Sequence, residues 1–205
     1  MKTVKIGHQE WSTENLNVDH FNNGDEIQQI ESAADWLMHL KEKKPAWCYY
    51  ENDASNEKKY GKLYNWHAVN DPRGIAPKGY HIPSDTEWTE LIDYLDGLPA
   101  NPNDVIGSGT IAGPKMKNDS GWNNSENGTN DSGFSALPAG KRSGFDGNFA
   151  NIGETGYWWS STEDYKTKAF GRVLLPNTRY GIKEGRIYKE TEFKESGFSV
   201  RCLRD

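Results

Sequence analysis

The sequence predicts an α+β fold, in which two helices pack on short antiparallel sheets with long irregular loops. Two stretches in the first hundred residues carry apolar side chains at three- and four-residue steps, the spacing of helices with one buried face. Beyond residue 133, short runs rich in aromatic and β-branched residues are separated by Gly and Asn turns, which is typical of strands. Because helical and strand patterns are segregated along the chain, an α+β arrangement is favoured over alternating α/β units.

The N-terminal segment is expected to form a strand, followed later by the first helix. Residues 4–6 alternate apolar and charged side chains, and Gly7 breaks that pattern. The first helix is predicted over residues 31–44, with Ser32 as its N-cap and Pro45 at its end. Its apolar face consists of Ala33, Trp36, Leu37 and Leu40.

The second helix has the clearest local signal in the chain. Ser84 and Glu87 form a capping box, in which each side chain satisfies a backbone N–H of the other residue, and Gly97 supplies the stop. The apolar stripe between them consists of Trp88, Leu91, Ile92 and Leu95. Residues 97–133 are rich in Gly, Asn, Ser, Asp and Pro and are expected to form a long irregular excursion.

Four short strands are expected in the C-terminal part of the chain. They cover residues 156–161, 169–175, 186–189 and 198–203. Neither an internal repeat nor a second apolar core is evident in the pattern, so residues 1–205 are expected to be a single domain.

The composition argues against two classes of partner. The chain has a formal net charge of −6 and no long run of Lys or Arg, so no nucleic-acid partner is expected. No stretch of about 18 apolar residues occurs, so the chain is not expected to insert into a membrane. The first residues lack the apolar core of a signal peptide. An extracellular or cell-surface location is expected if a leader has been removed, and a cytoplasmic or phage-associated location otherwise.

Six sequence motifs follow one another along the chain. They are VKIG at 4–7 leading to ENL at 14–16, YGKLYNW at 60–66, PKGYHIPS at 77–84, SGFSALPAG at 132–140, GYWWSST at 156–162 and GFSVRC at 197–202. In combination they resemble the Fibrobacter succinogenes major paralogous domain family, over essentially the whole chain. That family is related to the formylglycine-generating-enzyme branch of the C-type lectin fold. The resemblance implies a C-type-lectin-like domain with two helices, loop-rich insertions, and N- and C-terminal strands brought together.

The two cysteines bear on both fold and chemistry. Cys48 and Cys202 are expected to be buried thiols or one structural bridge, since neither lies in a C-x-x-C pair. The family usually has a cysteine where this chain has Ala76, so the resemblance implies that Cys202 lacks its partner. Formylglycine-generating relatives oxidise a substrate with paired metal-binding cysteines, and a soft metal needs thiolates held close together. Such an oxidase is therefore the least favoured function. Hydrolase signatures are also absent, and the chain is not expected to be an enzyme.

Three other features are expected to be structural. His81 is expected to form hydrogen bonds in the core, and at least one of Trp158 and Trp159 is expected to pack there, because adjacent strand residues point to opposite faces. One loop carries oxygen ligands of the kind that suits Ca²⁺, without the spacing of an EF-hand. Its residues are Asp119, Asn123, Asn124, Glu126, Asn127, Asn130 and Asp131. A solvated polar loop is favoured and no cofactor is expected, with calcium left open.

The candidate ligand-binding surface lies between Thr162 and Lys194. It holds Tyr165, Arg172, Asn177, Arg179, Tyr180, Arg186 and Tyr188. Tyr and Arg are enriched at binding hot spots. The resemblance implies an exposed ligand face in this stretch, and some members of the wider group are variable proteins diversified by retroelements.

The predicted function is non-catalytic binding of a protein or glycan on a surface. This function requires the aromatic and Arg side chains of the C-terminal stretch to be exposed and clustered. The alternative is a structural or assembly domain of a surface complex, which requires a large apolar patch for self-association. A polar hairpin without a partner is the simplest alternative for the stretch itself.

Overall fold

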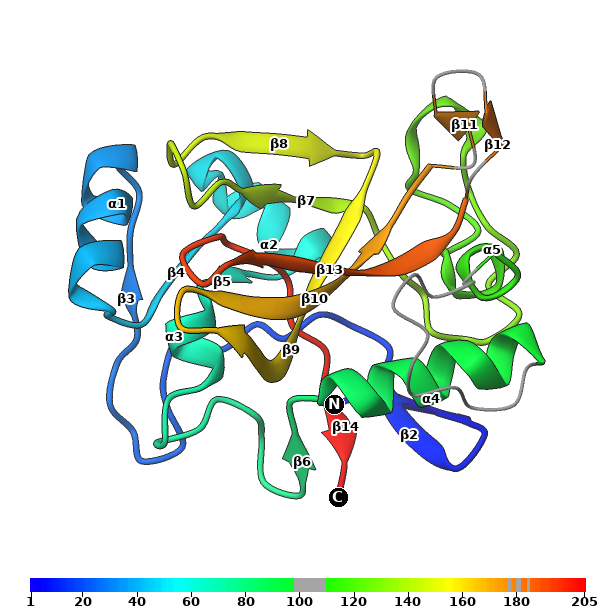
Figure 1. The fold of residues 1–205 in the computed structure, drawn as a ribbon, viewed down its shortest axis with the longest axis horizontal. Coiled ribbons are helices and arrows are strands. Elements are labelled where there is room, and N and C mark those ends of the chain that lie inside the picture. Colours follow the sequence, from blue (N-terminus) through cyan, green and yellow to red (C-terminus); the bar gives the residue numbers. More distant parts are fainter. Residues whose placement is uncertain (98–109, 177, 180–181, 184) are drawn as a thin grey trace.

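The computed structural model describes residues 1–97, 110–176, 178–179, 182–183 and 185–205. It is a mixed α+β fold of helices and small sheets, as Figure 1 shows. Aromatic side chains make up much of its buried core. The α-helices are α1 (Ala33–Glu42), α2 (Glu57–Tyr60), α3 (Trp66–Val69), α4 (Asp85–Asp96) and α5 (Ala112–Met116). Short 3₁₀ turns at Tyr50–Asn52, Ala54–Asn56 and Asn123–Ser125 complete the helical elements of these residues.

The two ends of the chain meet in one four-stranded sheet. Its order is β1 (Thr3–Ile6), β2 (Gln9–Ser12), β14 (Leu203–Arg204) and β6 (Tyr80–His81). Leu203 pairs with Trp11 on one side and with His81 on the other. Figure 1 shows both termini at this sheet, with the N-terminus near the start of β14 and the C-terminus at its end. The expected adjacency of the N- and C-terminal strands is confirmed.

A second, three-stranded antiparallel sheet carries most of the C-terminal segment. Its order is β13 (Ile187–Phe193), β10 (Lys168–Leu174) and β9 (Gly156–Tyr165). The small hairpin of β11 (Thr178–Arg179) and β12 (Ile182–Lys183) lies between β10 and β13 in sequence. Three of the four strands expected here are therefore present with shifted ends.

Two further small sheets complete the fold. One has the order β3 (Gln28–Gln29), β4 (Ala46–Cys48) and β5 (Leu63–Tyr64), and the other pairs β7 (Ala139–Arg142) with β8 (Phe149–Ile152). Helix α5 and one 3₁₀ turn lie within the stretch that was expected to be irregular throughout. That expectation was wrong for these residues, since the helix buries Ala112 and Met116 in the core. Its five residues are too few for a periodic apolar pattern to predict a helix.

The fourth expected strand, over residues 198–203, is only partly present. The chain there is extended and buried, but its hydrogen-bond partners change from residue to residue. Phe198 pairs with Tyr64, whereas the backbone carbonyl of Val200 accepts from Leu16. A regular strand needs one continuous partner, so only Leu203–Arg204 at its end is a strand.

Helix α4 begins and ends where the local signals indicate. The Ser84 hydroxyl oxygen accepts a hydrogen bond from the Glu87 backbone N–H, and the Glu87 carboxylate accepts one from the Ser84 backbone N–H at 2.7 Å. Gly97 ends the helix in the left-handed conformation, with φ of 72°. The predicted capping box and stop are confirmed.

Helix α1 is shorter than predicted. Its N-cap is confirmed, because the Ser32 hydroxyl oxygen accepts from the backbone N–H of Asp35. The helix ends at Glu42, because Lys43 has a positive φ of 53° and breaks the helical path before the proline. Trp36 is buried, whereas Ala33 and Leu37 are only half-buried.

The adjacent residues Trp158 and Trp159 are both fully buried, and they belong to different core clusters. Trp158 packs with Trp88 and Phe134, while the Trp159 ring stacks on Phe198 with centroids 4.4 Å apart. The strand directs the two rings to opposite faces, and both faces of the sheet are covered. The prediction that at least one packs in the core is confirmed, and neither ring is available to stack on a sugar.

The two cysteines are buried free thiols, which confirms one of the two expected states. Cys48 lies on β4 and Cys202 immediately precedes β14. Burial raises the pKa of each thiol to about 12, although nearby Arg142 and Arg201 act in the opposite direction. Both residues therefore remain protonated at neutral pH and fill space in the core.

Candidate ligand-binding site

The C-terminal candidate residues do not form one cluster among the described residues. Tyr165 lies at the end of β9 and is 70% exposed. It pairs with Lys168, whereas Tyr188 pairs with Val173, five residues further along β10. At roughly 3.4 Å per residue these two tyrosines lie about 17 Å apart along the strand.

Arg172 is a structural residue, and its selection as a ligand contact was wrong. Its side chain is 1% exposed, and Nη1 donates to the Asp85 carboxylate at 2.6 Å. Nη2 donates to the Asp85 carbonyl and to the Thr89 hydroxyl. The Asp85 carboxylate also accepts from Lys189 on β13, at 3.3 Å. These bonds fasten the three-stranded sheet to the first turn of α4.

The remaining candidates lie within or next to the β11–β12 hairpin in sequence. Arg186 and Tyr188 are half-buried, and the Arg186 guanidinium lies 5.8 Å from the Tyr188 ring centre. Tyr188 also packs against the core, so only part of its ring faces solvent. The Arg179 backbone belongs to β11, and the placement of its side chain lies outside the described part of the chain. Asn177 and Tyr180 also lie outside the described residues.

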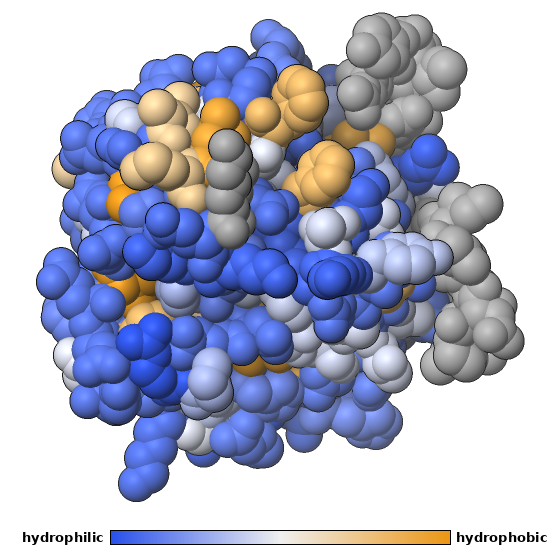
Figure 2. All heavy atoms as spheres, turned by 60° about the vertical axis from the view of Figure 1, so that its left-hand side comes forward, coloured by the Kyte–Doolittle hydropathy of each residue, from blue (hydrophilic) through white to orange (hydrophobic). Residues whose placement is uncertain are grey.

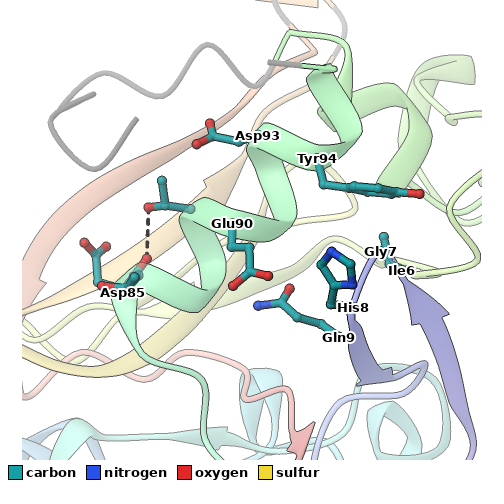
Figure 3. Close-up of a pocket in the computed structure, with 10 residues that line it drawn as sticks. Ile6, Gly7, His8, Gln9, Asp85, Glu90, Asp93 and Tyr94 are labelled. Atoms are coloured by element: carbon teal, nitrogen blue, oxygen red, sulfur yellow. Dashed lines mark hydrogen bonds between the residues drawn. The ribbon is translucent and has the colours of Figure 1, made fainter. Parts of the chain in front are cut away.

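A pocket that sequence reasoning missed lies between helix α4 and the turn that joins β1 to β2 (Figure 3). It has a volume of about 530 Å³, within the range of small-molecule sites. We refer to it as the α4 pocket. Its lining consists of Ile6, Gly7, His8, Gln9, Asp85, Thr86, Thr89, Glu90, Asp93 and Tyr94.

The helical repeat explains why six of these residues share one wall. Residues four apart on a helix lie one above the other, and α4 supplies two such rows. One row is Asp85, Thr89 and Asp93, and the adjacent row is Thr86, Glu90 and Tyr94. The apolar stripe of the same helix faces the core. The amphipathic pattern of α4 predicts the polar face that lines the pocket. It does not predict that the β1–β2 turn forms the opposite wall.

The opposite wall is the tight β1–β2 turn. Gly7 has φ of +60°, and a Cβ on it would lie 3.1 Å from the Tyr94 ring. The aromatic ring therefore lies over a residue without a side chain, as Figure 3 shows. The Gln9 amide is fixed in orientation, because it donates to the Glu87 carbonyl at 3.0 Å and accepts from the Trp11 indole at 2.9 Å.

The α4 pocket combines an aromatic surface with acidic and hydroxyl groups. Tyr94 is 59% exposed, and Figure 3 shows Glu90, His8 and Gln9 gathered beside it. Two cationic side chains already offset the Asp85 charge, whereas the Glu90 side chain is exposed to solvent. Among the described residues that line it are three carboxylates and one histidine, and none of these residues is Lys or Arg. Its electrostatics therefore favour neutral or cationic groups.

His81 lies at the edge of the core and not within it. Nε2 pairs with Glu87 at 2.9 Å and Nδ1 with Asp205 at 2.8 Å, and the side chain is 39% exposed. Burial acts to lower the His81 pKa, but the hydrogen bonds with Asp205 and Glu87 outweigh it and raise the pKa. The expected hydrogen bonding is confirmed and the expected core location was wrong, because β6 lies next to the C-terminal strand at the molecular surface.

The polar loop considered for calcium uses amide oxygens for its own structure. The Asn127 side-chain oxygen accepts from the Trp122 backbone N–H, and that of Asn130 accepts from the Ser135 backbone N–H. In the described part of the chain, no three His, Cys, Asp or Glu side chains are grouped as metal ligands. No helix in this part is long and apolar enough to cross a membrane.

Exposed large apolar side chains come from separate elements in the described structure. They are Met1, Met38, Tyr94, Ile111, Phe145, Tyr165 and Phe193. The face in Figure 2 is hydrophilic over most of its area, with apolar groups gathered toward its upper edge.

Comparisons with known proteins identify the family. No curated protein and no solved structure matches the chain. The family model described as the Fibrobacter succinogenes major domain matches residues 4–204. The chain therefore belongs to the Fibrobacter succinogenes major domain family.

Proposed function

We propose that the chain is a non-catalytic ligand-binding domain of the C-type-lectin-like class and that it binds a glycan in the α4 pocket. The observation that carries this proposal is the exposed Tyr94 ring beside fixed polar groups of the β1–β2 turn and α4. An apolar ring face with adjoining amide, hydroxyl and carboxylate groups matches a sugar, which presents apolar C–H surface and hydroxyl groups together. The adjoining terminal strands and the loop-rich fold support the finer fold assignment.

The charge of the α4 pocket narrows the ligand class. Asp85, Glu90 and Asp93 line it together with His8. A uronic or sialic acid would bring a carboxylate toward these groups, and like charges repel. Neutral or amino sugars are therefore the preferred ligands.

A glycan array tests the proposal with purified wild-type protein. The matched variants are Tyr94→Ala, which removes the ring, and Tyr94→Phe, which keeps it. Wild type and Tyr94→Phe are expected to bind the same neutral or amino-sugar glycans, and Tyr94→Ala is expected to lose them. Tyr165→Ala controls for loss of another exposed tyrosine. Binding that survives Tyr94→Ala and Glu90→Gln would reject the α4 pocket as the site.

A second candidate is protein binding through the end of the three-stranded sheet. Tyr165 and Phe193 are both exposed, and both pair across the ladder with Lys168. The Lys168 ammonium lies 5.0 Å from the Phe193 ring centre. Two exposed aromatic side chains around one cation resemble the composition of a hot spot. A Tyr165→Ala/Phe193→Ala variant that loses a surface-protein partner, while Tyr94→Ala retains it, would favour this candidate.

A further inference from the structure

A second cavity has a volume of about 580 Å³, and none of its described lining residues also lines the α4 pocket. Its walls come from the segment after β2, from helix α2 and from the loop that includes Asn118 and Ser135. Arg201 also lines it, although that side chain is 1% exposed. We refer to this cavity as the Arg201 cavity.

Arg201 is a buried cation, and its hydrogen bonds to described residues all go to neutral oxygen atoms. Nε donates to the Asn15 amide oxygen at 2.8 Å, and Nη1 donates to the carbonyls of Ser12 and Phe134. Nη2 donates to the Ser135 carbonyl at 3.1 Å. These bonds use four of the five guanidinium N–H groups. Arg201 forms no salt bridge with any residue that the structure describes.

A buried charge without a counter-ion is costly, and an anion beside it would lower that cost. Burial lowers the pKa of Arg201 to about 9, and only weaker attraction to Cys202 and Glu14 opposes it. Arg142 is a useful contrast within the same fold. It is equally buried and bonded to carbonyls, but its guanidinium lies within 5 Å of two ring centres, those of Trp36 and Phe149. Arg201 has one such ring and adjoins a cavity.

The rim of the Arg201 cavity adds further positive charge. Lys2, Lys58 and Lys59 line it and are exposed. The two acidic residues of the lining already have cationic partners, since Glu14 pairs with Lys2 at 3.2 Å and Glu57 pairs with Lys62 at 3.8 Å. With Arg201, the lining has four cations and two carboxylates, a net charge of +2 in a chain of net charge −6.

We propose that the Arg201 cavity binds a small ligand through an oxyanion group, which lies between Arg201 and the lysines of helix α2. Carboxylate, sulfate and phosphate groups share the chemistry required, because each offers several acceptor oxygens to a guanidinium and to ammonium groups. This site is independent of the proposed glycan site in position and in charge preference.

Calorimetry and thermal denaturation test the site with named probes. Sodium phosphate, sodium sulfate and sodium glucuronate are titrated against sodium chloride at matched ionic strength. The proposal predicts saturable binding and a rise in Tm for at least one of these oxyanions beyond that with chloride. A response to phosphate or sulfate alone would indicate a tetrahedral oxyanion ligand, and a response to glucuronate alone would indicate a carboxylate. Equal effects of all four salts would overturn the proposal.

Variants locate the binding without disturbing the buried arginine. Lys58→Gln/Lys59→Gln is expected to weaken oxyanion binding roughly three- to tenfold, the effect of two partly exposed ion pairs. Lys78→Gln/Lys166→Gln makes the same change in net charge outside the cavity and is expected to change affinity less than about twofold. Equal losses in the two variants would show general electrostatic attraction and contradict the proposal.

A measurement on the wild-type protein reports on Arg201 directly. The proton on Nε of a buried arginine exchanges slowly enough to give an NMR signal, and a bound oxyanion is expected to shift that of Arg201. Tyr94→Ala should leave this shift unchanged, so failure of the glycan proposal and failure of this one are distinguishable. A resolved Arg201 signal that stays fixed while the probe saturates would overturn the assignment.

Discussion

Removal of the Asp85 carboxylate is predicted to be among the most destabilising single changes at the surface of this fold. Asp85 is the acidic partner of Arg172, whose side chain is 1% exposed, and it also pairs with Lys189. In Asp85→Ala the Arg172 guanidinium keeps its bonds to the residue-85 carbonyl and the Thr89 hydroxyl but loses its counter-ion. Breaking a buried pair in this way costs about 3–5 kcal/mol.

The magnitude is large relative to the stability of a domain, which is about 5–15 kcal/mol. Asp85→Asn keeps an acceptor and loses the charge, so a smaller cost of about 1–3 kcal/mol is expected. Urea denaturation followed by tryptophan fluorescence measures both values, since several tryptophans are buried in the core.

A double-mutant cycle separates the ion pair from other effects of the change. Arg172→Met replaces the buried cation with an unbranched apolar side chain, so Asp85→Ala should cost much less in that background. The cycle should return a coupling energy of about 2 kcal/mol or more. A cost of Asp85→Ala below about 1 kcal/mol, or the same cost in both backgrounds, would refute the view that this pair fastens the sheet to α4.

Two other properties follow from buried or paired titratable groups. In the native protein Cys48 and Cys202 should react with a thiol reagent only slowly, and both should react at once in denaturant; fast reaction of either one in native protein would contradict their burial. The raised pKa of His81 should stabilise the fold fully below the unfolded-state pKa of about 6.5, and this contribution should fade as pH rises through the folded-state pKa. Because His81 is partly exposed, the difference in unfolding free energy between wild type and His81→Asn should stay below about 1 kcal/mol. If that difference is the same at pH 5.5 and at pH 8.5, the prediction is contradicted.

Helix α4 shows what local sequence determines. Ser84, Glu87 and Gly97 act on backbone groups within one turn, so the sequence alone predicted both ends of the helix. Its apolar stripe likewise predicted the buried face. The same pattern contained the polar face that lines the α4 pocket, but the facing turn at Gly7 is far away in sequence and no local rule brings it there.

The C-terminal sheet shows what local sequence leaves open. Arg172 and Tyr165 are both polar residues in a hairpin of mixed composition, and nothing near them distinguishes the buried one from the exposed one. The difference arises because the strand register places Arg172 opposite Trp158 and under the first turn of α4. The prediction that Tyr165 and Tyr188 lie close together was wrong for a related reason. The antiparallel register places the two residues beside opposite ends of β10.

Titration calorimetry of the glycan with the strongest array signal shows whether Tyr94 forms the sugar-binding surface of the α4 pocket. A sugar that covers about half of the exposed Tyr94 ring would bury roughly 60 Å² of apolar surface, worth about 1.5 kcal/mol, or about twelvefold in Kd. Tyr94→Ala is therefore expected to weaken binding about tenfold or more, while Tyr94→Phe and Tyr165→Ala stay within about threefold of wild type. Unchanged affinity in Tyr94→Ala, with the variant fully folded, would contradict this expectation.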